Sequence, residues 1–287
     1  MEFAKKQSKI DTILRSVDKL PTLPIIYTKL NQLLQSPNAT VKMIGSIIAE
    51  DQSMAVKVLR LVNSAFYGLP NKIGNLKHAI VILGLNQIRT LVLTTSTLKL
   101  FHNLKTTRAF DMQKFWKHSV GCAVAARVLA ETASLRSPDD VFAGGLLHDI
   151  GKLIHAVYLT EEFSAVVAEV NECGVPMVTS ERRVIGYDHT YTGKELAIRW
   201  NLSEGTIDMI AHHHLSDPAT TLTKEIAAVY LGNIFSIALG LGAGGEKKVP
   251  IADTNAWDIL GIELSHLESI ITRIDKVFAE SIAILEA

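Results

Sequence analysis

Gly145-Leu-Leu-His-Asp-Ile-Gly-Lys152 is the octapeptide that carries the most information about this chain. Among apolar residues and glycines it holds an imidazole and a carboxylate side by side, His148 and Asp149, with Lys152 one helical turn after the histidine. Consecutive residues of a helix lie about 100° apart, so His148 and Asp149 can converge on one metal ion. Burial of such groups without partners is costly. The octapeptide therefore predicts a buried helical segment that binds a cation.

The segments before and after this octapeptide also repeat the helical period. Apolar residues recur every three or four positions, and prolines, glycines or polar residues separate one run from the next. We expect helices over residues 10–20, 26–34, 41–48, 51–62, 75–83, 86–101, 111–132, from 137 through the octapeptide, 161–173, 180–185, 189–200, 203–213, 224–239 and 265–285. No stretch shows the alternation that is typical of a β-strand. We predict an all-α fold.

The polar stretch 102–108 has the composition of a linker and divides the chain into two helical parts. We expect an N-terminal helical bundle over residues 1–101 and a second helical subdomain with the metal site over residues 109–287. Residues 240–250 form the clearest late loop. The Gly-Ala-Gly-Gly at 242–245 follows no strand and lacks a following Lys-Ser or Lys-Thr. It is therefore not expected to bind phosphate as a P-loop does.

Composition argues against several classes of partner. The 29 basic and 29 acidic residues balance, so there is no electrostatic reason to expect nucleic acid or an anionic membrane as a partner. No apolar run approaches the roughly 20 residues that span a bilayer, and no signal peptide precedes the first expected helix. Cys122 and Cys173 lie far apart in helical patterns, which disfavours a disulfide framework. We expect a cytoplasmic protein that binds neither nucleic acid nor membrane.

Histidines suited to metal binding follow the linker. His118, His189 and the triplet 212–214 each lie in or at the end of an expected helix. Neutral imidazole suits Fe, Mn, Zn, Ni and Co, and the Asp149 carboxylate can bridge two ions. A single histidine of this kind is more often a core or cap residue, but the combined pattern favours a site. Four other histidines are expected at the surface or in helix caps: His78, His102, His155 and His212.

The order of these residues resembles the metal-binding signature of the HD phosphohydrolase superfamily. That signature matches His118, the pair His148-Asp149 and, in a late helix, Asn233. In the HD-GYP branch, further histidines supply a second metal, and the matching residues here are His189, His213 and His214. The resemblance implies two subsites that share Asp149. The first subsite would consist of His118, His148, Asp149 and Asn233, and the second subsite of Asp149, His189, His213 and His214.

Four further stretches resemble the HDOD family more specifically. They are Leu20-Pro-Thr-Leu-Pro24, Ile48-Ala-Glu-Asp51, Asn63-Ser-Ala-Phe-Tyr-Gly68 and Ala79-Ile-Val-Ile-Leu-Gly84. With the histidines, the resemblance covers about residues 20–215. HDOD proteins are all-helical, with an N-terminal bundle packed on an HD-like core. The resemblance implies a regulatory role in bacteria and a signalling partner that binds in trans.

Two departures from the catalytic pattern bear on function. Asn233 stands where catalytic HD proteins usually carry a metal-binding Asp, and Leu215-Ser-Asp-Pro218 replaces the Glu and the Gly-Tyr-Pro signature of the HD-GYP branch. With two divalent ions, Asp149 would be the only anionic ligand, which leaves a large uncompensated charge in a desolvated site. The second subsite keeps all its usual ligand types. We expect one divalent transition metal ion (Fe, Mn, Ni, Zn or Co) rather than two.

Two functions remain open, and either allows a phosphate or nucleotide ligand. The first is an HDOD-type bacterial signal-transduction protein with an altered metal site and weak or no catalysis. The second is a metal-dependent phosphohydrolase that acts on a cyclic dinucleotide, a nucleotide or another phosphoester. In such an enzyme Asp149 would position the attacking water or accept its proton, and Lys152 would neutralise a non-bridging oxygen. Lys152 is equally consistent with an exposed basic residue. Asn233 favours the first function.

Overall fold

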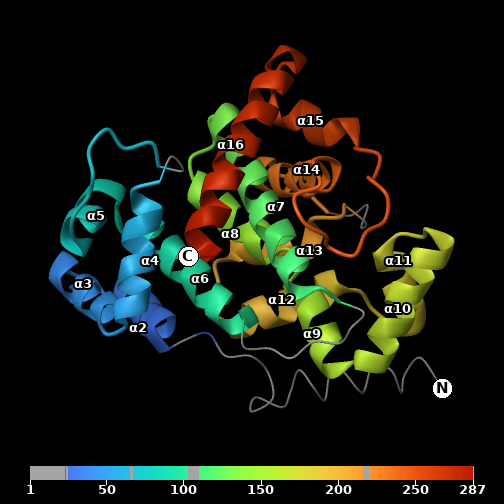
Figure 1. Ribbon diagram of the computed structural model, residues 1–287, viewed down its shortest axis with the longest axis horizontal. Coiled ribbons are helices and arrows are strands. Elements are labelled where there is room, and N and C mark those ends of the chain that lie inside the picture. The colour runs from blue at the N-terminus through green and yellow to red at the C-terminus, as the bar shows by residue number, and fades with distance from the viewer. Residues whose placement is uncertain (1–22, 24, 65–66, 103–109, 216–219, 287) are drawn as a thin grey trace. The chain divides into compact units, whose positions relative to one another are not determined.

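The computed structural model describes residues 23, 25–64, 67–102, 110–215 and 220–286 (Figure 1). Within these ranges every regular element is a helix and no strand occurs, which confirms the predicted all-α class. The helix expected over residues 10–20, most of the Leu20–Pro24 motif and residues 103–108 of the expected linker lie outside the described residues.

The chain divides into two compact units. We call them the bundle unit, residues 23–103 with 271–287, and the histidine unit, residues 104–270. The helices of the bundle unit are α2 (Ile25–Leu34), α3 (Val41–Ala49), α4 (Gln52–Val62), α5 (Leu76–Leu83) and α6 (Leu85–His102). The last helix of the chain, α16 (Leu267–Glu286), also belongs to this unit from residue 271 on.

Local sequence explains the helix starts of the bundle unit. The side chains of Thr40, Asp51 and Asn75 accept hydrogen bonds from backbone N–H groups in the first turns of α3, α4 and α5. At the end of α4, the Asn63 side chain exchanges two hydrogen bonds with the backbone of Ile73, at 2.7 and 2.9 Å. The first residue of the Asn63–Gly68 motif therefore fixes the loop that leads to α5.

The histidine unit is built around α7 (Met112–Thr132), which is buried from Phe115 to Ala130 apart from Lys117. Both α8 (Pro138–Leu147) and α14 (Lys224–Ala238) pack on α7. Glycines permit this close approach: a Cβ on Gly145 would lie 2.8 Å from the Ala123 Cα, and one on Gly232 would lie 2.8 Å from the Ala126 nitrogen. The three helices hold the core that carries the candidate site.

The histidine unit contains further helices beside this core (Figure 1). They are α9 (Ile150–Tyr158), α10 (Thr160–Cys173), α11 (Met177–Val184), α12 (His189–Arg199), α13 (Glu204–His212), α15 (Thr254–Leu260) and the short 3₁₀ helix η1 (Leu264–His266). Two helix pairings matter for the site: α12 packs on α9 and also on α13. Among the described helices, none is long and apolar enough to cross a bilayer.

The octapeptide differs from our expectation in one respect. We expected one helical segment through it, but α8 ends at Leu147 and α9 begins at Ile150, so His148 and Asp149 lie at the junction of two helices. Asp149 stands at the N-cap position of α9, and its carboxylate makes no capping hydrogen bond. The junction leaves that carboxylate available to the histidines around it.

Candidate metal centre

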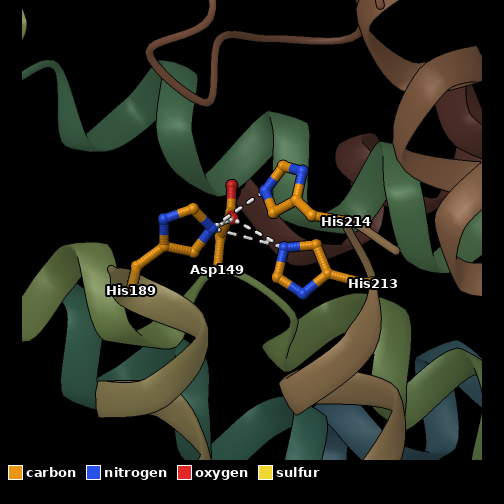
Figure 2. A group of neighbouring side chains, drawn as sticks. All are labelled: Asp149, His189, His213 and His214. Atoms are coloured by element: carbon orange, nitrogen blue, oxygen red, sulfur yellow. Dashed lines mark hydrogen bonds and ion pairs between the residues drawn. The ribbon is translucent and has the colours of Figure 1, made fainter. Parts of the chain in front are cut away.

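Three elements besides the α8–α9 junction bring histidines to Asp149. His118 comes from the second turn of α7, and His189 is the first residue of α12. His213 and His214 follow the last turn of α13. Figure 2 shows the rings of His189, His213 and His214 converging on the Asp149 carboxylate. All these side chains are buried, except that His214 is partly exposed.

The two oxygens of Asp149 face different groups of histidines. Oδ2 lies 3.2 Å from His148 Nε2 and 3.5 Å from His118 Nε2. Oδ1 lies 3.2 Å from His189 Nε2 and 3.5 Å from His213 Nε2. His189 Nε2 is also 3.0 Å from His214 Nε2. The structure thus brings together, around one carboxylate, the two sets of His and Asp residues that the family resemblance implies.

Unpartnered polar atoms show that this cluster fits a metal ion. The buried atoms His118 Nε2, His148 Nε2 and Asp149 Oδ1 make no hydrogen bond within the described chain. Buried polar groups are nearly always paired, so orphaned ligand atoms that face one another indicate a missing partner. Imidazole nitrogen and carboxylate oxygen are donors that suit divalent transition metals. The donor set therefore fits such an ion.

Outer hydrogen bonds orient the imidazoles. His148 Nδ1–H donates to the Gly145 carbonyl at 2.7 Å, and His213 Nδ1–H donates to the Ile210 carbonyl at 2.8 Å. His118 Nδ1–H donates to Ser236 Oγ at 3.1 Å, because the Ser236 hydroxyl itself donates to the His118 carbonyl. Each bond leaves Nε2 as the ring atom that faces Asp149, as metal-binding histidines require.

Lys152 is buried in the cluster, with 1% of its surface exposed, and does not lie on an exposed face. Its ammonium group donates to Asp149 Oδ2 at 2.8 Å and to the Gly244 carbonyl at 3.0 Å. Burial alone would lower the pKa of Lys152, but the nearby carboxylates, Asp149 foremost and then Glu246, together outweigh burial and raise it. A permanent cation therefore already lies against the Asp149 oxygen that belongs to the first subsite.

Burial decides the charge of most of the histidines. It lowers the pKa of His118, His148 and His214, and lowers that of His213 to about 4, so these rings are neutral. Burial would raise the pKa of Asp149, but His148 and Lys152 hold it well below its ordinary value. A carboxylate surrounded by neutral imidazoles is the protonation state that binds metal.

His189 is the exception. Burial would lower its pKa, but the attraction of Glu181 and the hydrogen bonds to Glu181 and Asp149 together outweigh burial and raise the pKa to about 9. Without a metal, His189 therefore carries a proton near neutral pH. Its Nε2 lies within hydrogen-bond distance of His213 and His214, at 3.3 and 3.0 Å.

The expectation that His155 is a surface or capping residue is wrong. His155 is fully buried and lies between Glu181 and Thr192, because α9 packs on α12. His78 is exposed, as expected, while the His102 side chain lies outside the described residues. Asn233 is buried on α14, and its Oδ1 makes no hydrogen bond within the described residues.

Sequence reasoning missed two contributions to the cluster. Glu181 is a fully buried acidic residue of α11, and its polar neighbours in sequence gave no signal of burial. The glycine-rich loop covers the cluster: a Cβ on Gly244 would lie 2.7 Å from the His118 ring and 3.1 Å from Asp149 Oδ2. Only the run of glycines could have indicated such a close approach of the backbone.

A cavity of about 370 Å³ lies beside the cluster. His214 and Asn233 line it on the side of the cluster, and Glu246, Lys247 and Lys248 line it from the glycine-rich loop. Apolar residues complete the wall, among them Val175, Pro176, Ile234 and Val249. The cavity is of the size that small-molecule ligands occupy.

Comparison with known proteins agrees with this architecture. The model of the HDOD domain family matches residues 20–216. An HDOD domain protein of unknown function from Geobacter sulfurreducens is 27% identical, and the match covers 99% of this chain and 98% of that one with a TM-score of 0.76. A candidate phosphohydrolase from Shewanella amazonensis SB2B shares the fold, with 23% identity, a TM-score of 0.74 and coverage of 95% and 97%.

Curated relatives extend the same similarity to longer proteins. An uncharacterized protein from Treponema pallidum (strain Nichols) is 24% identical over 199 residues, which are 69% of this chain and 38% of that protein. The chain spans about a third of the length of the curated relatives that it matches.

Proposed function

This chain belongs to the HDOD domain family, and on that basis we propose that it is a regulator in bacterial signal transduction. In this proposal its histidine cluster binds one divalent transition metal ion (Fe, Mn, Ni, Zn or Co) at the second subsite, with weak or no catalysis. The regulator acts in the cytoplasm on a signalling protein that binds in trans.

One observation carries the proposal of a single ion: the Lys152 ammonium group lies 2.8 Å from Asp149 Oδ2. A second cation at the first subsite would have to share that oxygen with the ammonium group, and like charges in a buried site repel strongly. Gly244 also packs against His118 and Asp149 at this subsite. The second subsite faces the other oxygen, Oδ1, which accepts no hydrogen bond from Lys152.

When bound at the second subsite, a divalent ion supplies a fixed positive charge and Lewis acidity at the wall of the cavity. Hydrogen bonds within the chain connect the histidine cluster to an exposed loop. Lys152 holds the Gly244 carbonyl, and Glu246 accepts a hydrogen bond from the Met177 nitrogen. The same loop continues to Val249 and Ile251, whose side chains are exposed. This connection supports a loop that presents the state of the cluster to a protein partner.

Metal stoichiometry and a turnover screen test the proposal. We expect elemental analysis of purified protein to find one tightly bound equivalent, and metal-loaded protein to hydrolyse phosphoesters no faster than the His148→Ala variant. Two tightly bound equivalents would contradict the single-ion site. Robust turnover that His148→Ala abolishes would contradict the non-catalytic regulator.

The cavity favours a second candidate function, a metal-dependent phosphohydrolase acting on a cyclic dinucleotide, a nucleotide or another phosphoester. Its wall includes Asn233 from the first subsite and His214 from the second. In this function Asp149 would accept a proton from the attacking water, and Lys152 would neutralise a non-bridging phosphate oxygen. The Asn233→Asp variant separates the two functions, because restoring the usual carboxylate should raise turnover at least tenfold only in an enzyme.

A further inference from the structure

Glu181 is a fully buried carboxylate that lies outside both subsites. One of its oxygens, Oε2, accepts hydrogen bonds from His189 Nδ1 at 2.6 Å and from the His189 backbone nitrogen at 3.0 Å. The other oxygen, Oε1, accepts a hydrogen bond from His155 Nδ1 at 3.0 Å. Burial without partners would be costly for this carboxylate, and the two histidines compensate it.

The far side of His155 is also held. His155 Nε2 and the Thr192 hydroxyl group form a hydrogen bond of 2.8 Å. Thr192 lies one helical turn after His189 on α12, so both ends of the chain of hydrogen bonds are attached to the same helix. Close packing of α9 on α12 adds rigidity, because a Cβ on Gly151 would lie 2.0 Å from the His189 carbonyl oxygen. The Glu181 carboxylate therefore has little freedom to move away from His189.

The outer partner of His189 differs from those of the other histidines. His148 and His213 donate to backbone carbonyls, and His118 donates to a serine hydroxyl. Among these four rings, only that of His189 donates to a carboxylate. A charged acceptor at Nδ1–H fixes the ring and increases the electron density at Nε2, which makes the imidazole a stronger metal ligand.

We propose that Glu181, braced by His155 and Thr192, is the positioning residue that makes the second subsite the tighter metal site. It holds His189 with Nε2 directed at Asp149 Oδ1, and it places a second protein anion next to this subsite. The inference rests on the proposed function, since it requires a metal ion at the second subsite. Glu181 is neither part of the family signature nor one of the expected metal ligands.

The test compares Glu181→Gln with a matched control, Glu169→Gln. Gln keeps the size of the side chain and removes its charge. Glu169 also contacts α11, where Ser180 and Arg183 are its partners, and it makes no hydrogen bond to a histidine in the described chain. The control therefore reports on loss of a carboxylate at α11 without a change at His189.

The measurement is Zn²⁺ affinity by competition with a chromophoric chelator, with the visible absorption spectrum of the Co²⁺-loaded protein as a second readout. We expect Glu181→Gln to bind Zn²⁺ about 10- to 100-fold more weakly than wild type, with an altered Co²⁺ spectrum. Glu169→Gln should match wild type in both. Wild-type affinity and an unchanged spectrum in folded Glu181→Gln would overturn the inference.

Two outcomes separate this inference from the proposed function. If the wild-type protein bound no Zn²⁺, both would fail. If wild type bound one equivalent and Glu181→Gln bound it equally well, only the inference would fail. Should Glu181→Gln not fold, His155→Asn and His155→Leu replace it, because Asn retains a donor near the position of Nδ1 and Leu does not. We expect the larger loss of Zn²⁺ affinity in His155→Leu, and equal affinities in the two variants would overturn the inference.

Discussion

The two subsites share the Asp149 carboxylate but hold different cations in the metal-free protein. At the first subsite the cation is the Lys152 ammonium group, 2.8 Å from Oδ2. At the second it is the proton that the raised pKa of His189, about 9, keeps on that ring near Oδ1. A metal ion can displace a proton into solvent, whereas the ammonium group is tethered to the chain. The comparison explains how one carboxylate can favour a metal at one side only.

Removing the shared carboxylate should have the largest effect. In Asp149→Asn the Lys152 ammonium group remains buried beside neutral acceptors such as the Gly244 carbonyl, with the Glu246 carboxylate 4.0 Å away. Loss of one partner of a buried ion pair costs roughly 3–5 kcal/mol, and we expect a decrease of that size in the free energy of unfolding. Urea denaturation in the presence of EDTA measures it.

A double variant provides the control for this effect. Asp149→Asn with Lys152→Met removes both charges and should recover a substantial part of the lost stability, since an uncompensated buried ammonium group is then absent. If the single and double variants had the same free energy of unfolding, Asp149 would not be the group that compensates the charge of Lys152.

The proton at the second subsite predicts how metal affinity depends on pH. Metal binding at His189 Nε2 must release a proton, because the pKa of His189 is about 9. Between pH 6 and 8 the affinity for Zn²⁺ should therefore rise by up to about tenfold per pH unit. Competition titrations at pH 6, 7 and 8 check this. An affinity that is independent of pH would show that no displaceable proton occupies the second subsite, and the contrast with the Lys152 ammonium group at the first subsite would be wrong.

The neutral histidines predict that the stability of the metal-free protein also rises with pH, in the acidic range. Burial lowers the pKa of His213 from 6.5 to about 4, so the unfolded chain binds more protons between these values and stability falls as pH falls through that range. Since one pKa unit corresponds to about 1.4 kcal/mol, His213 alone should contribute a loss of about 2 kcal/mol between pH 6.5 and 5. His189, with its raised pKa, loses its contribution only as pH rises towards 9.

Chemical denaturation of metal-free protein at pH 6.5 and 5.0 measures this loss. His213→Gln serves as the control, because it lacks the ring whose neutral form the native state requires. Its stability should depend less on pH in this range. A wild-type protein that is equally stable at both pH values would show that the buried rings are not held neutral.

The sequence could predict the all-α class and which histidines meet, because the helical period and the order of the family motif encode both. It could not predict the break at His148-Asp149 or the burial of Lys152, since a lysine in an apolar run is compatible with either face of a helix. Glu181 and Gly244 act through packing of α11 and of the loop onto distant helices. Such contacts leave no local pattern in the chain.

Removing the tethered cation should have a smaller, specific effect on the first subsite. In Lys152→Met, Asp149 Oδ2 loses its ammonium partner, and we expect the second equivalent of Zn²⁺ to bind about tenfold more tightly, about 1.4 kcal/mol. Lys247→Met is a suitable control. Lys247 belongs to the loop that Lys152 contacts through Gly244, but its ammonium group donates to the Asn171 carbonyl. If both variants bound the second equivalent as wild type does, Lys152 would not be what limits the first subsite.

Anomalous diffraction from crystals of the Zn²⁺-loaded wild-type protein, with data on both sides of the zinc edge, tests the central claim most directly. We predict one strong peak, bounded by Asp149 Oδ1, His189, His213 and His214, with Lys152 still in contact with Oδ2. Two peaks of comparable height, one of them between His118 and His148, would contradict the account.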